Sequence, residues 1–219
     1  MLSPINFSIL MYHNVCNSTI RRKESLFVSP SIFRKQLTLL KRVFKIDLFD
    51  VKTVVSDLSK IAITFDDGLE FNFLNLLPVL CEYEIKGHFF IPTSFVGKVW
   101  DLGMFKMMDW KMIKEMSDLG MDIGSHSITH PILKRCNRKQ IRDEVVNSKK
   151  QIEDVIGKEV KGFCYPFGCF TEYVVETVRN AGYKFAMSTI NDNVQDSLFV
   201  LNRIGVSNKT DIYKLIGAL

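Results

Sequence analysis

Residues 60–68, KIAITFDDG, join an apolar run to a pair of acidic residues and a glycine. The apolar part predicts a buried strand over 60–65, because β-branched and aromatic residues dominate it. Asp66 and Asp67 follow at once, and two like charges side by side at the end of a buried strand are unfavourable unless a cation or a proton relieves them. The stretch therefore predicts a sheet strand with a charged site at its carboxyl end.

Apolar runs alternate with amphipathic ones along the rest of the chain. A helix is predicted over 29–44, because Ser29 can cap it, Pro30 fits its first turn and apolar residues recur at helical spacing. Pro78 predicts a kink in a helix over 72–84. The other predicted strands are 6–13, 87–92, 121–125, 161–165, 183–188 and 199–206, and the other helices are 109–119, 137–156, 171–181 and 210–217.

This alternation of strands and helices predicts parallel strands with helices outside, either in an open doubly wound sheet or in a closed barrel. About seven units favour a deformed (β/α) barrel in the α/β class. A chain of 219 residues with 47% hydrophobic residues is long enough for a large core. Because no linker or repeat interrupts it, a single domain over 1–219 is expected.

Charge and cysteine content narrow the class of protein. The net charge of +5 is modest and its basic clusters are short, so no nucleic-acid partner is expected. Five cysteines without a C-x-x-C pair indicate reduced, mostly buried thiols. The chain has no signal-peptide pattern and no apolar run of about 18 residues, so we expect a cytoplasmic protein without a transmembrane segment. A chain whose leader had been removed would look the same, and no feature indicates an oligomeric state.

Polar side chains recur where the predicted strands end. His13 ends the first strand, the aspartate pair ends the strand over 60–65, and His126 with His130 follows the strand over 121–125. The carboxyl ends of parallel strands meet at one edge of a sheet or barrel, so these groups should face a common mouth. One carboxylate and two imidazoles make a three-ligand site with a position left for water, the arrangement of catalytic zinc, and the second carboxylate is then free to act as a base.

Each of these motifs has a simpler interpretation when taken alone. An Asp-Asp-Gly triplet often forms a turn, and two histidines four residues apart can lie in a solvated turn or on an ordinary helix. Both motifs occur here in order, each directly after a predicted buried strand of one alternating chain. That combination favours the metal site over the simpler interpretations.

The motifs resemble those of the polysaccharide deacetylases of carbohydrate esterase family 4, which share the NodB-homology domain. ITFDDG (63–68) is similar to the first motif of that family, HSITH (126–130) to the second, and CYPFG (164–168) to a shortened third motif. ILMYHNV (9–15) and GHFFIPTSFVG (87–97) resemble the branch that contains bacterial poly-N-acetylglucosamine deacetylases. The resemblance extends over nearly the whole chain.

The resemblance implies a deformed barrel with fewer than eight complete units and a divalent ion, most often zinc. It implies that Asp67, His126 and His130 bind the ion and that Asp66 is the base. It further implies that the backbone N–H of Phe167 helps to hold the oxyanion. We also assign Tyr165 and Arg203 to the oxyanion and substrate side of the site.

Two features depart from the family pattern. The third motif of the family carries an arginine that orients the catalytic aspartate, and KGFCYPFG (161–168) has none. The fifth motif contains Leu-x-His, whose histidine protonates the leaving amine, whereas this chain has LNRIGV (201–206) with Arg203, and a guanidinium is a poor proton donor. His13 is the best local substitute as the acid, although a histidine that is hydrogen-bonded in the barrel wall fits its position equally well.

Other chemistry-bearing residues are expected to be structural. His88 begins a strand, Asp109 and Trp110 mark a helix start, and Cys164 lies inside a predicted strand, which argues against a thiol mechanism. The sequence therefore predicts a metal-dependent hydrolase that removes N-acetyl groups from an acetylated amino sugar or polysaccharide precursor, such as a bacterial surface-polysaccharide building block. The alternatives are a carbohydrate-binding homologue without turnover and a hydrolase of another, non-peptide C–N bond.

Overall fold

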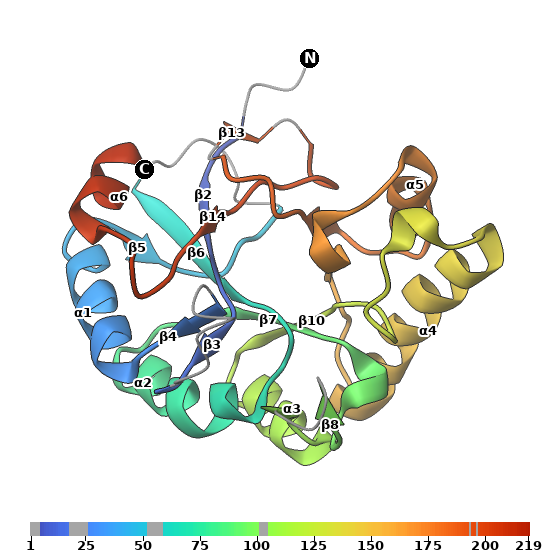
Figure 1. Ribbon diagram of the computed structural model, residues 1–219, viewed down its shortest axis with the longest axis horizontal. Helices are drawn as coiled ribbons and strands as arrows, with labels where there is room; N and C mark the ends of the chain where they lie inside the picture. The colour runs from blue at the N-terminus through green and yellow to red at the C-terminus, as the bar shows by residue number, and fades with distance from the viewer. Residues whose placement is uncertain (1–4, 18–25, 52–58, 101–104, 193, 196) are drawn as a thin grey trace.

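A curled parallel sheet surrounded by helices forms the centre of the computed structural model (Figure 1), which describes residues 5–17, 26–51, 59–100, 105–192, 194–195 and 197–219. Every strand pair in this sheet is parallel, as the βα alternation predicts. β5 (Lys45–Ile46) pairs with the start of β6 beside the main path. In spatial order the sheet contains β12 (Phe185–Met187), β11 (Gly162–Cys164), β10 (Asp122–Ser125), β7 (His88–Ile91), β6 (Lys60–Phe65), β2 (Ser8–Tyr12) and β14 (Ile204–Gly205).

The sheet curls into a half-barrel, in agreement with the predicted deformed (β/α) barrel. Helices line its outer side from α1 round to α5 (Figure 1). Within the described ranges, none of the helices combines the length and the apolar character that a membrane crossing requires. The helices are α1 (Pro30–Leu40), α2 (Leu77–Glu82), α3 (Trp110–Asp118), α4 (Arg138–Ile156), α5 (Glu172–Asn180) and α6 (Ile212–Ala218).

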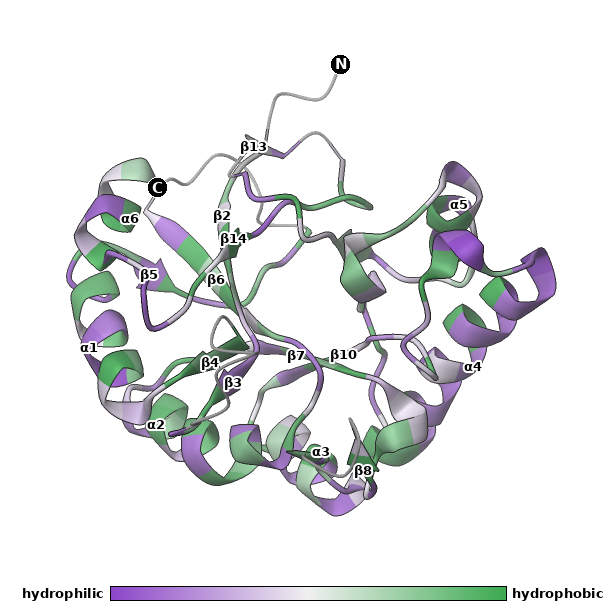
Figure 2. Cartoon of the chain, viewed as in Figure 1, coloured by the Kyte–Doolittle hydropathy of each residue, from purple (hydrophilic) through white to green (hydrophobic). Residues whose placement is uncertain are grey.

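Capping residues set the helix ends. The Ser29 side chain accepts a hydrogen bond from the backbone N–H of Ile32 at the start of α1, and Pro30 occupies its first turn. Asn137 and Gln140 form a reciprocal capping box at the start of α4, which ends at Gly157 in the left-handed conformation. Hydrophobic and hydrophilic stretches alternate along α1 and α4 (Figure 2), as expected for helices with one buried face.

The predicted helix over 72–84 is two different elements. Residues Asn72–Leu76 form a wide π-helical segment, η2, and α2 follows from Leu77. The proline ring of Pro78 would clash with the carbonyl of Leu74 in a regular α-helix, and the wider turn relieves that clash. The irregularity therefore lies on the N-terminal side of the proline.

Several short strands outside the main sheet were absent from the sequence-based prediction. They are too short to carry an apolar period, since each strand has two residues. The predicted strand over 199–206 is likewise reduced to β14, with Leu201 in an isolated bridge to Met187. The additional pairs are β1 (Ile5–Asn6) with β13 (Val194–Gln195), β3 (Asn14–Val15) with β4 (Phe27–Val28), and β8 (Val99–Trp100) with β9 (Phe105–Lys106).

Alternation along β6 decides which side chains enter the barrel. Ile61, Ile63 and Phe65 pack in the larger core cluster, which also contains the buried helix residues, whereas Ala62 belongs to the inner cluster with Phe90, Cys164 and Met187. Successive strand residues face opposite sides of a sheet, so Ala62 and Thr64 place the next even residue, Asp66, on the inner side as well. The strand period thus directs Asp66 to the barrel interior.

Candidate metal centre and active site

One cavity at the carboxyl edge collects most of the predicted site residues. It has a volume of about 410 Å³, within the range of small-molecule sites. Seven of the eight residues singled out from the sequence line it, and Arg203 is the exception. The seven are His13, Asp66, Asp67, His126, His130, Tyr165 and Phe167.

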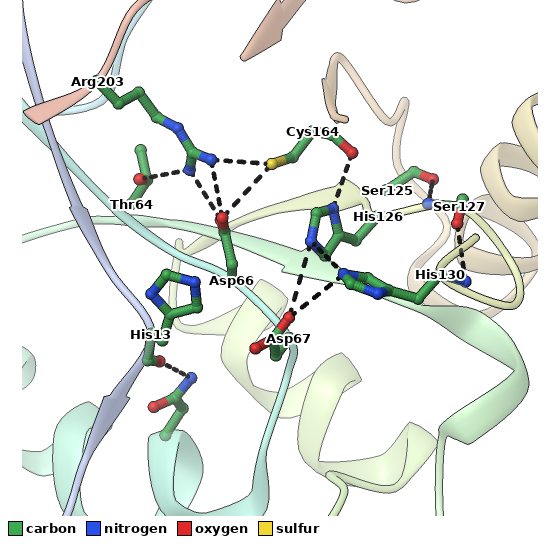
Figure 3. Close-up of polar contacts among 11 residues, drawn as sticks. His13, Thr64, Asp66, Asp67, Ser125, His126, Ser127, His130, Cys164 and Arg203 are labelled. Atoms are coloured by element: carbon green, nitrogen blue, oxygen red, sulfur yellow. Dashed lines mark hydrogen bonds and ion pairs between the residues drawn. The ribbon is translucent and has the colours of Figure 1, made fainter. Parts of the chain in front are cut away.

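Asp67, His126 and His130 converge on one point (Figure 3). The Nε2 atoms of His126 and His130 each lie 3.7 Å from Oδ1 of Asp67, and the two Nε2 atoms are 3.1 Å apart. Ligands held tetrahedrally at 2.0–2.2 Å from zinc lie about 3.3–3.5 Å from one another. The triangle of donor atoms therefore has the size that a bound divalent ion requires.

Hydrogen bonding and burial leave both imidazoles able to bind a metal ion. Nδ1 of His126 lies 2.8 Å from the carbonyl oxygen of Cys164, and because that oxygen only accepts, Nδ1 carries the hydrogen and Nε2 keeps its lone pair. Burial, assisted by the neighbouring His126, lowers the pKa of His130 to about 3, so its ring is neutral at physiological pH. Neutral imidazoles and a carboxylate are the donor set that zinc takes in proteins.

Asp66 is paired with an arginine on its other side. Nη1 of Arg203 donates to Oδ1 of Asp66 and Nη2 donates to Oδ2, each over 2.8 Å. Burial alone would raise the pKa of Asp66, but the adjacent guanidinium outweighs it and holds that pKa well below its usual range. Asp66 is therefore a carboxylate of fixed charge and orientation.

Arg203 is a buried partner of Asp66 and not a residue of the cavity wall. Its side chain has no exposed surface, and besides Asp66 it donates to the carbonyl oxygen of Ser188, to Oγ1 of Thr64 and to Sγ of Cys164. The assignment of Arg203 to the substrate side is corrected accordingly. The sequence signal for this role was an arginine inside an apolar segment, LFVLNRIGV, where a buried charge requires a partner.

A second group of possible ligands, Asp66, His126 and Cys164, also clusters within 4.8 Å. The Arg203 guanidinium already contacts both Asp66 and Cys164, and its positive charge opposes a metal ion at that point. Burial raises the pKa of the Cys164 thiol well above its usual value, which keeps it protonated. The triad with Asp67 is therefore the better metal centre.

Backbone strain is concentrated at this site. Asp67, Ser127, His130 and Phe167 all have positive φ angles, between 55° and 70°, and the one other such non-glycine residue among those described is Glu84. Non-glycine residues adopt this conformation at an energetic cost that persists where function requires it. The strained residues are two members of the metal triad and two neighbours in the loops around it.

His13 lies across the two aspartates from the imidazole pair (Figure 3). Its carbonyl oxygen accepts a hydrogen bond from Nδ2 of Asn72, which fixes the backbone of the loop that carries it. The Tyr165 side chain lines the cavity while its hydroxyl donates to the carbonyl oxygen of Phe199. The Phe167 ring is more than half exposed and packs edge-on against His130.

Aromatic and aliphatic residues that sequence reasoning did not assign to the site form another wall of the cavity. The Trp100 ring meets His130 edge-on with ring centroids 5.1 Å apart, and Phe167 makes a second edge-on contact with the same imidazole. Trp110, by contrast, packs against the large core cluster as expected, and Asp109 caps α3. The additional wall residues are Leu26, Phe27, Leu69, Trp100 and Phe105.

His88 is a structural histidine on the inner side of the sheet. Its Nε2 accepts the backbone N–H of Phe49 over 2.8 Å, so its Nδ1 donates to Asp122, also over 2.8 Å. Both ring nitrogens are satisfied, and the ring is buried against Phe90 and Phe185.

Comparison with known proteins identifies the family of the chain. The sequence profile of the family described as Polysaccharide deacetylase matches residues 55–186, more than half of the chain. The chain belongs to the polysaccharide deacetylase family. Peptidoglycan-N-acetylmuramic acid deacetylase PdaA of Bacillus subtilis (strain 168) is 31% identical over 164 residues, which cover 74% of this polysaccharide deacetylase chain and 57% of PdaA.

Other relatives of this polysaccharide deacetylase extend the comparison. The chitooligosaccharide deacetylase of Bradyrhizobium sp. (strain ANU 289) is 28% identical, over 63% of this chain and 60% of that protein. The Streptococcus pyogenes deacetylase PplD in complex with acetate has a TM-score of 0.86 at 21% identity and covers 99% of both chains. IcaB from Ammonifex degensii has a TM-score of 0.85 at 21% identity, over 97% of this chain and 96% of that chain. At such identities the two structures support the fold.

The matched part of the chain spans between 51% and 60% of the length of three of its curated relatives.

Proposed function

We propose that this chain is a metal-dependent hydrolase that removes N-acetyl groups from an amino sugar or a polysaccharide precursor. The observation that carries the proposal is the triangle of Asp67, His126 and His130 next to an ion-paired Asp66 in one cavity. Family membership supports the same chemistry, because the relatives are named as deacetylases of peptidoglycan and chitooligosaccharides.

Asp67, His126 and His130 are the proposed ligands of a divalent ion, and zinc suits the set of one carboxylate and two neutral imidazoles. When bound, such an ion polarises the acyl carbonyl and lowers the pKa of water. Cys164 is not a proposed ligand, but its carbonyl oxygen accepts a hydrogen bond from His126 and so orients that ring. The left-handed backbone at Asp67 and His130 turns their side chains toward the shared point.

Asp66 is the proposed general base, which takes a proton from the attacking water. Arg203 keeps Asp66 ionised over the physiological pH range and holds its two oxygens in a fixed plane. A carboxylate with a lowered pKa is a weak base, so this role suits a water that is already acidified. Arg203 is a positioning residue, since it touches Asp66 and does not line the cavity.

Two further groups complete the proposed mechanism. The backbone N–H of Phe167 is proposed to donate to the oxyanion that develops as water attacks the acyl carbon. His13 is proposed to protonate the leaving amine, because it lies across the aspartates from the metal triad and lines the same cavity. Tyr165 is proposed to contact the substrate through its ring, since its hydroxyl is already bonded to Phe199.

The proposed substrate is an N-acetylated amino sugar. The cavity presents aromatic rings next to polar groups, which is a surface that suits the apolar faces and hydroxyl edges of a sugar. A binding homologue without turnover was the main alternative, and the absence of the motif arginine was one argument for it. Arg203 supplies a guanidinium to Asp66 from the segment just before β14, which answers that argument.

The test is loss of one acetyl group from a panel of N-acetylated sugars, followed by mass spectrometry. We expect metal-loaded protein to release acetate, and we expect Asp66→Asn and a chelator each to abolish the release. Asp118→Asn is the matched control, because Asp118 is exposed on α3 and forms an ion pair with Lys114. The proposal fails if metal-loaded wild type leaves N-acetyl, O-acetyl and N-formyl sugars all unchanged.

A further inference from the structure

The cavity extends beyond the groups that the proposed mechanism uses. Next to His13 its wall includes Asn14 and then Leu26 and Phe27, which lie on the neighbouring short strand β4 and just before it. Asn14 pairs with Phe27 in the parallel register of β3 and β4. This side of the cavity is therefore built by a small two-stranded sheet at the mouth, outside the main barrel.

Asn14 carries an unused hydrogen-bond acceptor in this wall. Its side chain is 1% exposed, and its Oδ1 has no hydrogen-bond partner among the described residues. A buried acceptor without a partner destabilises a folded protein, so native structures contain few of them and each requires an explanation. Of the three such atoms among the described residues, Asn14 Oδ1 is the one whose residue lines the cavity.

The backbone around Asn14 is fixed on both sides. Nδ2 of Asn72 donates to the carbonyl oxygen of His13 over 2.9 Å, and Nδ2 of Asn75 donates to the carbonyl oxygen of Val15 over 3.1 Å. Both asparagines lie on η2, so one element clamps the residues before and after Asn14. The backbone of Asn14 is therefore held in place beside His13, the proposed acid.

We propose that Oδ1 of Asn14 accepts a hydrogen bond from a hydroxyl group of the sugar and that Asn14 is a specificity-determining residue. This inference rests on the proposed function. A sugar carries hydroxyl donors around an apolar ring face, and this wall offers the matching pair, an amide oxygen beside the side chains of Leu26 and Phe27. A site with a buried hydrogen-bonding group strongly rejects an analogue that lacks the matching hydroxyl, because the group is then left unpaired.

The experiment compares wild type with Asn14→Leu, which has nearly the same shape but no acceptor. The substrates are N-acetylchitotriose and analogues that lack the 3-hydroxyl or the 6-hydroxyl, and KM and kcat are measured by acetate release together with the melting temperature. Thr93→Val is the matched control, because the Thr93 hydroxyl is also buried without a partner among the described residues but lies outside the cavity lining.

We expect Asn14→Leu to raise the melting temperature and to raise KM about two- to tenfold with a smaller change in kcat. We expect Thr93→Val to raise the melting temperature with an unchanged KM. One of the two deoxy sugars should have a higher KM with wild type than the parent sugar has. For that deoxy sugar, wild type and Asn14→Leu should have the same KM, because the hydrogen bond is absent in both cases.

Three outcomes would overturn the inference. The first is an unchanged KM in Asn14→Leu for every substrate. The second is an equal loss for the parent sugar and both deoxy sugars, which would show that Asn14 does not contact either hydroxyl group. The third is wild type that turns over all three sugars alike, a result that needs no variant to fold. Wild type that is inactive on every sugar would instead refute the proposed function itself.

Discussion

Arg203 reaches Asp66 across 137 positions of sequence and holds it through two parallel hydrogen bonds of 2.8 Å each. The pair lies on the inner side of the half-barrel, with Arg203 fully buried and Asp66 at the cavity. A bidentate guanidinium–carboxylate pair fixes orientation as well as charge. The relationship explains how the site tolerates a third motif without arginine.

Removal of Arg203 should damage both stability and turnover. Arg203→Met leaves a buried carboxylate without its partner, and we expect the free energy of unfolding to fall by about 3–5 kcal/mol. Arg203→Lys keeps the charge but not the two parallel bonds, so we expect kcat to fall while KM changes little. Denaturant unfolding and steady-state kinetics measure the two effects. Arg138→Met serves as the surface control, and an equal loss in that variant would contradict the role of Arg203.

Substitutions of the two adjacent aspartates should have different effects on metal binding. Asp67→Asn weakens a ligand of the triad, so we expect the purified protein to lose its bound divalent ion. Asp66→Asn changes a group that faces Arg203, so we expect it to keep the ion while losing turnover. Elemental analysis and the rise in melting temperature on zinc addition report binding without activity. Equal metal loss in both variants would mean that the ligand and base roles are assigned wrongly.

His13 should matter most when the leaving group needs a proton. We expect His13→Gln to lower kcat on an N-acetyl sugar by about 10²–10⁴-fold, the usual contribution of a general acid. On an activated aryl acetate the leaving group departs without protonation, so the same substitution should have little effect. The ratio of the two kcat values is the measurement. A similar loss on both substrates would indicate that His13 positions the substrate or the loop instead of donating a proton.

Asp122, which does not line the cavity, should make the free energy of unfolding depend on pH. Burial raises its pKa, but the hydrogen bond from His88 outweighs burial, and the net pKa lies below the usual value of 3.8. A lowered folded-state pKa stabilises the protein above the unfolded-state pKa, and that stabilisation disappears as pH falls through the folded-state pKa. Asp122→Asn keeps an acceptor without the charge, so we expect a loss of about 1 kcal/mol at neutral pH.

Urea unfolding at several pH values tests this expectation. The difference between wild type and Asp122→Asn should be constant from neutral pH down to about pH 4 and should shrink below it. A difference that grows toward acidic pH would reverse the sign of the linkage. Asp118→Asn is again the surface control.

Much of the barrel could be predicted because the hydrophobic period of the sequence and its helix-capping residues indicate the same elements. The strand over 60–65 has the predicted bounds, and Ser29 caps a helix where the sequence indicates one. The helix over 29–44 ends earlier, at Leu40, because a propensity pattern does not specify where tertiary contacts stop. The two-residue strands β3, β4, β8 and β9 carry no readable period, so the mouth of the cavity could not be drawn from sequence.

The convergence of the three proposed metal ligands could be predicted, because these ligands lie in short contiguous motifs. Asp67, His126 and His130 come from two compact motifs at the ends of β6 and β10. Arg203 was missed as the partner of Asp66 because a guanidinium group can reach the same point from a different strand. Its Nη2 lies 3.0 Å from the sulfur of Cys164, a residue of the shortened third motif, although the two residues are 39 positions apart. Sequence order conceals such an exchange, and only the folded barrel reveals it.

Arg203 lies just before β14, the last strand of the sheet, and this position has a consequence for synthesis. Strand β6 leaves the ribosome long before β14 does, so the nascent barrel holds Asp66 without a counter-ion for most of synthesis. The pairing of β14 with β2 brings Arg203 to Asp66. A chain that lacked this last segment would keep Asp67, His126 and His130 but would leave Asp66 without its ion-pair partner.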